Sequence, residues 1–167
     1  FAMTNTRRFW LAAIILVTIA LDQQTKMMAR ASLMNAIPHR YAGVLTLLYT
    51  ENPGAFLSLG ENLPPNVRHV VFDGLVSIGL LVAAFVLFTA RMQPGSDDIA
   101  IAFIIGGGVG NLIDRFRLGG RVTDFIFLAA GPVHTGVFNI ADMAITGGVL
   151  WLALSWLLTS LRRKSAT

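Results

Sequence analysis

The chain has 167 residues and a net charge of +4, and its length fits a single domain. Only 13% of its residues are charged, whereas a soluble domain has about 25%, and 54% are hydrophobic. This balance excludes an ordinary soluble domain and predicts an integral membrane protein. No basic stripe is interleaved with aromatic residues, which argues against a nucleic-acid partner. Cysteine is absent, which excludes a disulfide framework and thiolate chemistry.

Four apolar runs follow one another along the chain, and a spanning helix needs about 20 mostly apolar residues. Each run reaches that length only by including flanking polar residues such as Asp73, Asp114 or Asp142. Charges at such depth are costly and usually face a bundle interior or a polar cavity. The sequence therefore predicts one mainly α membrane domain over residues 1–167 with four transmembrane helices. Their expected bounds are roughly 9–28, 68–90, 97–115 and 141–161.

The first apolar run has a second interpretation as a cleavable signal peptide. Two arginines precede it, and Ala29-Arg30-Ala31 resembles a small-x-small cleavage site. Because three further apolar runs follow, we favour a retained span. Its polar end carries Asp22 and Lys26, four residues apart with the acid first, which is the favourable order for a helical ion pair. We expect this pair to hold polar groups inside the end of the bundle.

Two long connections separate the runs, over residues 32–66 and 116–140. Each contains a strand-like segment, Val44–Thr50 in the first and Val122–Phe127 in the second, and Ala55–Leu59 is a further candidate strand. Four spans place both connections on one face of the membrane, opposite the termini. We therefore expect a small sheet with loops on that face.

The segment Arg91–Asp98 is short and contains a Pro-Gly turn, which predicts an antiparallel hairpin of the second and third helices. The side that it shares with the termini has six basic residues and the opposite side has seven, so this count leaves the orientation undecided. The six lie in short segments close to helix ends, where positive charge has its strongest effect. We therefore expect both termini in the cytoplasm and the long connections on the non-cytoplasmic face.

Glycines are concentrated in the third run, which invites comparison with a nucleotide-binding loop. A dinucleotide fingerprint needs G-x-G-x-x-G, but the third glycine is missing in either register, and no P-loop lysine follows. Gly106 and Gly110 instead form G-x-x-x-G, which is typical of helices that pack closely in lipid. We expect these glycines to have a packing role.

Three polar residues, Asn111, Asp114 and Arg115, follow the glycines with the spacing of one helical face. Spacing alone leaves two alternatives open. One is a cap at the membrane interface in which Asp114 and Arg115 are solvated. The other is the edge of an active site in the membrane.

Two further acids, Asp124 and Asp142, come from separate segments that the topology brings to the same membrane face. Taken singly, Asp124 is an ordinary exposed acid on a strand. Asp142 is the acid of a capping box that Asn139 begins. Taken together, two carboxyls held close share one proton, so one acts as base on a water while the other donates to a carbonyl. This is the chemistry of an aspartic protease.

Other chemistries have less support from the sequence. The three histidines lack a metal-ligand spacing, and Ser58 does not lie in G-x-S-x-G. A Ser–Lys dyad of Lys26 with Ser32 or Ser58 has nothing to orient it. Two classes besides proteases stay open: a small polytopic transporter, which would place its acids in mid-span, and a non-catalytic membrane assembly protein, which needs no acid pair.

The polar motifs closely resemble those of the bacterial lipoprotein signal peptidases, also called signal peptidase II, in the family's order over the whole chain. The matching segments are LDQQTK (21–26), ENPGAF (51–56), GGGVGNLIDRFRLGGRVTDF (106–125) and FNIAD (138–142). One departure follows the Asn-x-Gly-Ala motif. Where the family usually has a small residue and then Phe and Ser, this chain has Phe56-Leu57-Ser58.

The resemblance implies an intramembrane aspartic endopeptidase that removes signal peptides from prolipoproteins by cutting before a Cys that carries diacylglyceryl. It implies Asp124 and Asp142 as the catalytic pair, and no metal or organic cofactor. The expected partners are lipid-modified prolipoproteins and membrane lipid. We expect a monomer in the bacterial plasma membrane, with its site near the outer face. The residues expected to line or support this site are Asp22, Lys26, Asn52, Gly54, Asn111, Asp114, Arg115, Asn139 and Ala141.

Overall fold

Helices dominate the computed structural model of this chain, which describes residues 4–54, 62–89 and 96–164. The helical elements are α1 (Asn5–Leu33), α2 (Pro65–Arg68), the π-helical segment η2 (His69–Leu75), α3 (Val76–Thr89), α4 (Ser96–Arg117) and α5 (Ile140–Lys164). Four stretches are long and apolar enough to cross a membrane: Asn5–Leu33, Pro65–Thr89, Asp97–Arg117 and Ile140–Arg163. The second of these joins α2, η2 and α3 into one span.

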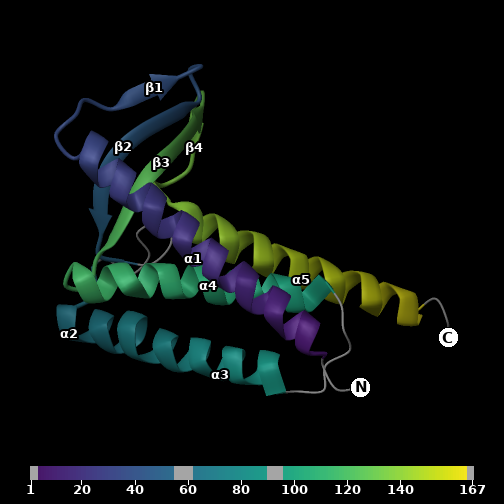
Figure 1. Cartoon of the computed structure of the whole chain (residues 1–167). Helices are drawn as coiled ribbons and strands as arrows, with labels where there is room; N and C mark the ends of the chain where they lie inside the picture. Colours follow the sequence, from purple (N-terminus) through teal and green to yellow (C-terminus); the bar gives the residue numbers. More distant parts are fainter. Residues whose placement is uncertain (1–3, 55–61, 90–95, 165–167) are drawn as a thin grey trace.

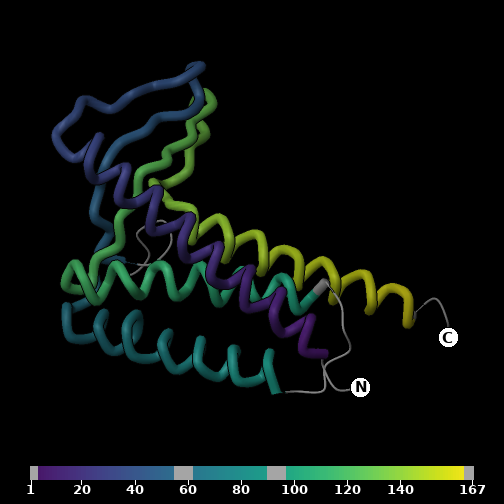
Figure 2. The backbone as a smooth tube through the Cα atoms, viewed as in Figure 1, coloured from purple at the N-terminus to yellow at the C-terminus, as the bar shows by residue number. Residues whose placement is uncertain are grey.

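The long helices form one bundle with a sheet at one end (Figure 1). The start of α1, the end of α5, and the adjoining ends of α3 and α4 lie at the other end (Figure 1). The helix α4 is central and packs against α1, α3 and α5, as the backbone trace also shows (Figure 2). The mainly α membrane fold with a small sheet, predicted from the sequence, is confirmed.

Close packing between α1 and α4 depends on the two glycines of the G-x-x-x-G motif. A Cβ on Gly106 would lie 2.8 Å from the Cβ of Thr18, and a Cβ on Gly110 would lie 2.5 Å from an oxygen of Asp22. Real Cβ atoms do not approach so closely, so only glycine lets the two helices meet here. The packing role expected from the sequence is confirmed.

The apolar core of the bundle and most of its buried polar residues lie at opposite ends. At the end that holds the termini, Leu11, Leu87, Ala102 and Ile105 form an apolar core between α1, α3 and α4. The outward faces of the helices expose large apolar side chains such as Trp156, which suits a surface that faces lipid. Most of the buried polar residues lie at the sheet end, whereas Asp98 is buried at the end that holds the termini.

The sheet has four antiparallel strands in the order β1-β2-β3-β4. The strands β2 (Leu45–Asn52) and β3 (Val122–Ala130) occupy the two strand-like segments, whereas β1 (His39–Tyr41) and β4 (Val133–His134) were not predicted. These two are too short to show a period-2 pattern. The candidate strand at residues 55–59, the Pro-Gly turn at 94–95 and the Phe56-Leu57-Ser58 departure lie outside the described residues.

The first apolar run is part of the folded bundle. The helix α1 continues unbroken through Ala29-Arg30-Ala31, and Ala29 is buried. A signal peptidase cleavage site needs an extended segment, so the structure favours the retained span over the cleavable signal peptide. The polar end of α1 packs against the sheet.

Backbone pairing ties the start of α5 to β3. Phe138 forms an antiparallel bridge with Ile126, and its carbonyl also accepts a hydrogen bond from the amide of Phe125 at 3.1 Å. The pairing of β2 with β3 is irregular between Leu47 and Thr50 of β2, opposite Phe125 of β3. Bulges of this kind redirect side chains and are frequent next to functional sites. The bridge and the hydrogen bond of Phe138 bring the strand segment around Asp124 beside the first residues of α5.

Candidate active site

A cluster of buried polar side chains occupies the sheet end of the bundle. Asp124 is 1% exposed, and Asp114 and Arg115 are 5% and 7% exposed. The interpretation of these three residues as solvated groups is therefore wrong. The buried polar members of the cluster come from α1, β2, α4, β3 and the start of α5: Asp22, Lys26, Asn52, Asp114, Arg115, Thr123, Asp124, Asn139 and Asp142.

The carboxyl of Asp124 accepts hydrogen bonds from two amide side chains. The Nδ2 of Asn52 lies 2.9 Å from Oδ2, and the Nδ2 of Asn139 lies 2.6 Å from Oδ1. Burial and then the charge of Asp142 raise the pKa of Asp124 to about 7, against the opposing effect of the two amides. Asp124 therefore holds a proton more readily than an ordinary surface acid.

Asp142 lies in the first turn of α5, where it forms a reciprocal capping box with Asn139. The backbone amide of Asp142 donates to Oδ1 of Asn139 at 2.9 Å, and the backbone amide of Asn139 donates to Oδ2 of Asp142 at 3.3 Å. The other carboxylate oxygen accepts from Nδ2 of Asn111 at 2.9 Å. Asn139 thus contacts both carboxyls, so capping and site assembly are one arrangement and not alternatives.

An ion pair on α1 contacts both Asn111 and the first turn of α5. Lys26 and Asp22 form the expected pair at 2.8 Å, and the Lys26 ammonium also donates to Oδ1 of Asn111 at 2.9 Å. The other oxygen of Asp22 accepts from the backbone amide of Ala141 at 3.0 Å. These contacts engage Lys26 with an acid and an amide, whereas Ser58, one possible partner in a Ser–Lys dyad, lies outside the described residues.

Asp114 and Arg115 form hydrogen bonds with backbone atoms at the ends of β2 and β3. Asp114 accepts from the backbone amide of Thr123 at 2.8 Å, which fixes the strand next to Asp124. Arg115 donates to the carbonyl of Gly54 at 2.6 Å and to that of Gly120 at 3.1 Å, and these are its hydrogen bonds within the described residues. The Arg115 fork therefore joins the end of β2 to the turn between α4 and β3.

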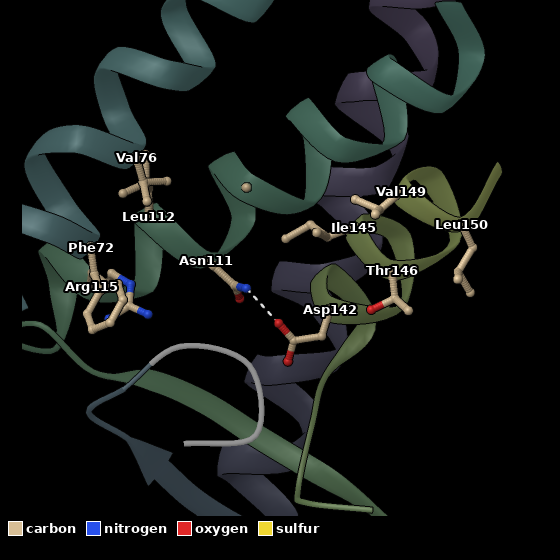
Figure 3. A pocket seen from close by; sticks show the side chains of 11 residues that line it. Phe72, Val76, Asn111, Leu112, Arg115, Asp142, Ile145, Thr146, Val149 and Leu150 are labelled. Carbon is tan, nitrogen blue, oxygen red and sulfur yellow. Dashed lines mark hydrogen bonds between the residues drawn. The ribbon is translucent and has the colours of Figure 1, made fainter. Parts of the chain in front are cut away.

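A cavity of about 360 Å³ opens beside Asp142. Its walls come from η2 and α3 on one side and from α5 on the other, with α4 behind (Figure 3). Figure 3 shows the Asp142 carboxyl and the Asn111 amide directed toward each other at the polar end of the cavity. The other walls are mostly apolar, and the lining residues include Phe72, Val76, Ile145, Val149 and Leu150. The cavity suits an apolar ligand with one polar group near Asp142.

The structure brings all the residues expected from the sequence into this one network, with Gly54 and Ala141 contributing backbone atoms. Sequence reasoning missed three members. Gln23 donates to Asp22 and Asp114, Thr123 binds Asp114 through its backbone, and Phe72 lies under the Arg115 guanidinium at 5.1 Å. Gln23 and Thr123 are sequence neighbours of Asp22 and Asp124, so their positions could have indicated a role in the site. Phe72 lies in an apolar run, where no sequence pattern distinguishes it from its neighbours.

A metal centre would need several clustered ligands. Across residues 4–54, 62–89 and 96–164, no three His, Cys, Asp or Glu side chains gather in a way that could hold a metal ion. The chemical capacity of the site lies in the two carboxyls, which share amide donors and adjoin a largely apolar cavity.

Comparison with known proteins points to one family. A family model described as signal peptidase (SPase) II matches residues 14–158. The lipoprotein signal peptidase of Desulforapulum autotrophicum is 36% identical over 152 residues, covering 87% of this chain and 91% of the relative. That of Hydrogenovibrio crunogenus is also 36% identical, over 161 residues, covering 93% of this chain and 87% of the relative.

The fold comparison agrees with the sequence comparison. A solved structure described as a bacterial membrane enzyme matches with a TM-score of 0.77 at 24% identity, covering 90% of this chain and 88% of the other. A second, also described as a bacterial membrane enzyme, matches with a TM-score of 0.74 at 22% identity, covering 88% and 92%. The family match over most of the length shows that the chain belongs to the signal peptidase II family.

Proposed function

We propose that this protein is an aspartic endopeptidase that removes the signal peptide from prolipoproteins whose cysteine carries diacylglyceryl, cutting before that cysteine. Asp124 and Asp142 form its catalytic pair. The observation that carries this proposal is that Asn139 donates to both carboxyls, which come from separate elements and are both buried. The transporter and the assembly protein have no comparable support, because the acids lie at the end of the bundle and the family is one of peptidases.

The chemistry follows from one proton shared by two acids. Asp142 takes a proton from a water that attacks the scissile carbonyl carbon, and Asp124 gives its proton to the carbonyl oxygen. The tetrahedral gem-diol then collapses: one of its hydroxyls returns a proton to Asp124 as the carbonyl re-forms, the C–N bond breaks, and the leaving nitrogen receives the proton that Asp142 holds. The pKa of about 7 for Asp124 supports its role as the acid of this first step.

The cavity beside Asp142 accommodates the substrate in this proposal. A signal peptide is an apolar helix, so its cleavage site lies at membrane depth, where lipid offers a peptide bond no partner. The apolar walls of η2, α3 and α5 suit lipid and apolar side chains, while Asn111 and Arg115 provide polar groups at the end where the bond is cut. The remaining polar residues of the network support this geometry.

The proposed orientation places the termini in the cytoplasm and the catalytic pair near the outer face of the bacterial inner membrane. The start of α1 and the end of α5 share one end of the bundle, and the buried acids lie at the other (Figure 1). The basic residues near the helix ends on the terminal side support this direction. We propose a monomer, because one chain supplies every member of the network.

The test is cleavage of a diacylglyceryl-modified prolipoprotein, followed by gel shift, with Asp124→Asn, Asp142→Asn and the double variant. Each single change removes the general acid–base contribution, so we expect a loss of roughly 10²–10⁴-fold or more. Groups that act as a unit are non-additive, so the double variant should be little worse than either single variant.

Expression and thermal stability in detergent serve as controls for these variants. Near-normal turnover by either single variant would contradict the shared pair. If Asp142→Asn lost stability while turnover per folded molecule stayed unchanged, Asp142 would be only the acid of the capping box.

A further inference from the structure

Three asparagine side chains face the two carboxyls, and each has two possible amide orientations. A side-chain amide is fixed when its oxygen meets a group that only donates, because the nitrogen must then point the other way. The oxygen of Asn52 accepts from the backbone amide of Gly54 at 2.8 Å, and that of Asn139 accepts from the backbone amide of Asp142 at 2.9 Å. Both asparagines therefore direct their N–H groups at Asp124.

The third asparagine, Asn111, is fixed differently. It lies within α4, where its neighbours' backbone amides serve the helix, so no local donor is available to its side chain. Its oxygen instead accepts a 2.9 Å hydrogen bond from the ammonium of Lys26 and a longer one, at 3.2 Å, from Nδ2 of Asn139, which is already directed at Asp124 at 2.6 Å. A lysine ammonium has three donors and no acceptor, so the Asn111 nitrogen must face Asp142, as its 2.9 Å hydrogen bond shows.

Lys26 is itself held rigidly. Its side chain is 3% exposed and lies 2.8 Å from Oδ2 of Asp22, which is fully buried. The second oxygen of Asp22 accepts from the backbone amide of Ala141, the residue directly before Asp142. One ion pair on α1 therefore reaches Asp142 by two routes, through the backbone of α5 and through the Asn111 amide.

We propose that Lys26 is a positioning residue that orients the Asn111 amide, so that an N–H donor and not a carbonyl oxygen meets Asp142. This inference rests on the proposed function of the acid pair. Without the ammonium, the Asn111 oxygen keeps only the longer hydrogen bond from Nδ2 of Asn139, at 3.2 Å, and the amide can rotate to present its oxygen to the Asp142 carboxylate. Two acceptors then face each other, the Asp142 carboxylate keeps only its bond from the Asn139 backbone amide, and the base that activates water is misplaced.

The experiment is a double-mutant cycle with Lys26→Met and Asn111→Ala, measured as kcat and KM on lipidated prolipoprotein in detergent. Loss of one charge-assisted hydrogen bond predicts a fall in kcat of about 10- to 100-fold for Lys26→Met, with KM little changed. If Lys26 acts mainly through Asn111, the same change in the Asn111→Ala background lowers kcat much less than it does in the wild type, and any remaining fall comes from the second route through Asp22 and Ala141. If Lys26→Met does not yield folded protein, the same cycle with Lys26→Gln has the same expectation.

Arg7→Met is the matched control. Arg7 forms an ion pair with the fully buried Asp98 at 2.8 Å, at the opposite end of the same helix. This change should lower thermal stability and leave kcat per folded molecule unchanged. An equal fall in kcat for Lys26→Met in both backgrounds, or no fall in either, overturns the inference. The proposed function fails separately, if Asp124→Asn or Asp142→Asn keeps its turnover.

Discussion

Asn139 is fully buried and donates to both carboxyls, with its side-chain nitrogen on Asp124 and its backbone amide on Asp142. Buried carboxyls are costly unless they are hydrogen-bonded or neutralised. In this protein each carboxyl has amide donors, and burial raises the pKa of Asp124 to about 7. At the scale of single residues, hydrogen bonds therefore offset part of the cost of burying the two acids.

The raised pKa of Asp124 predicts a pH dependence. Below about pH 7 Asp124 carries the proton needed by a general acid, and above it the proton is lost, so kcat/KM should fall as pH rises through about 7. The Asn52 amide lowers this pKa, so Asn52→Ala should move the falling limb to higher pH. A pH profile of both proteins checks this, and a limb that stays in place would assign it to another group.

The same proton also contributes to stability. The folded state binds it with a pKa of about 7, whereas the unfolded chain binds it at 3.8. This contribution is complete below the unfolded value and is lost as pH rises through the folded value. Thermal unfolding of the wild type at several pH values should therefore show it decreasing over that interval.

Arg115 is expected to orient the site and not to react. Its planar fork spans the carbonyls of Gly54 and Gly120, a geometry that the single ammonium of lysine does not reproduce. Arg115→Lys should lower cleavage by about 10- to 100-fold, the effect of one charge-assisted hydrogen bond, in a protein that still folds and inserts. Arg121→Lys is the matched control, because Arg121 is largely exposed and forms a surface ion pair with Glu51. Equal activity of the two variants would show that the Arg115 fork is not needed to orient the site.

At the scale of whole elements, the approach of α4 to α1 determines where the acids meet. The contact at Gly110 is the tightest point, because the Asp22 carboxylate that binds Lys26 lies directly against it. The side-chain cluster and the helix packing are therefore coupled. A change in the distance between the helices displaces the ion pair.

Gly110→Ala tests this coupling. The added methyl would lie 2.5 Å from an oxygen of Asp22, so we expect overpacking to cost about 1–3 kcal/mol and to lower cleavage as well. Gly147→Ala is the control, since a Cβ there meets nothing within 4 Å and alanine favours the helix. Thermal unfolding in detergent measures both, and equal melting temperatures would show that α1 and α4 tolerate a wider spacing.

Sequence patterns predicted the elements that carry long apolar runs or several strand-like residues, and they missed β1, β4 and the π-helical η2. A strand of two or three residues has no readable period, and a π-helical turn depends on how its neighbours pack. The acids were found because charges next to spans are rare. Their donors were named from the resemblance, but the contact between Lys26 and Asn111 joins two helices that are distant in sequence, so no local pattern indicates it.

At the scale of the whole molecule, the bundle has one end with the termini and one end with the site. The proposed orientation puts the first of these in the cytoplasm. Because the chain has no cysteine, a single Ser96→Cys at the start of α4 reports its side without background. An impermeant thiol reagent should label it only after permeabilisation, while Ala130→Cys on the exposed end of β3 should label in intact cells. Labelling of Ser96→Cys from outside would reverse the orientation.

Asn139, which directly precedes α5, donates hydrogen bonds to both carboxyls. The site therefore cannot be complete until this last part of the chain has been made. A growing chain delivers α1, the sheet strands and α4 before residue 139 is made. Asp124 then lacks one of its amide donors, and Asp142 is still absent. In the proposed mechanism, the pair is completed only when α5 forms and enters the bundle, so an unfinished chain would carry no complete acid pair.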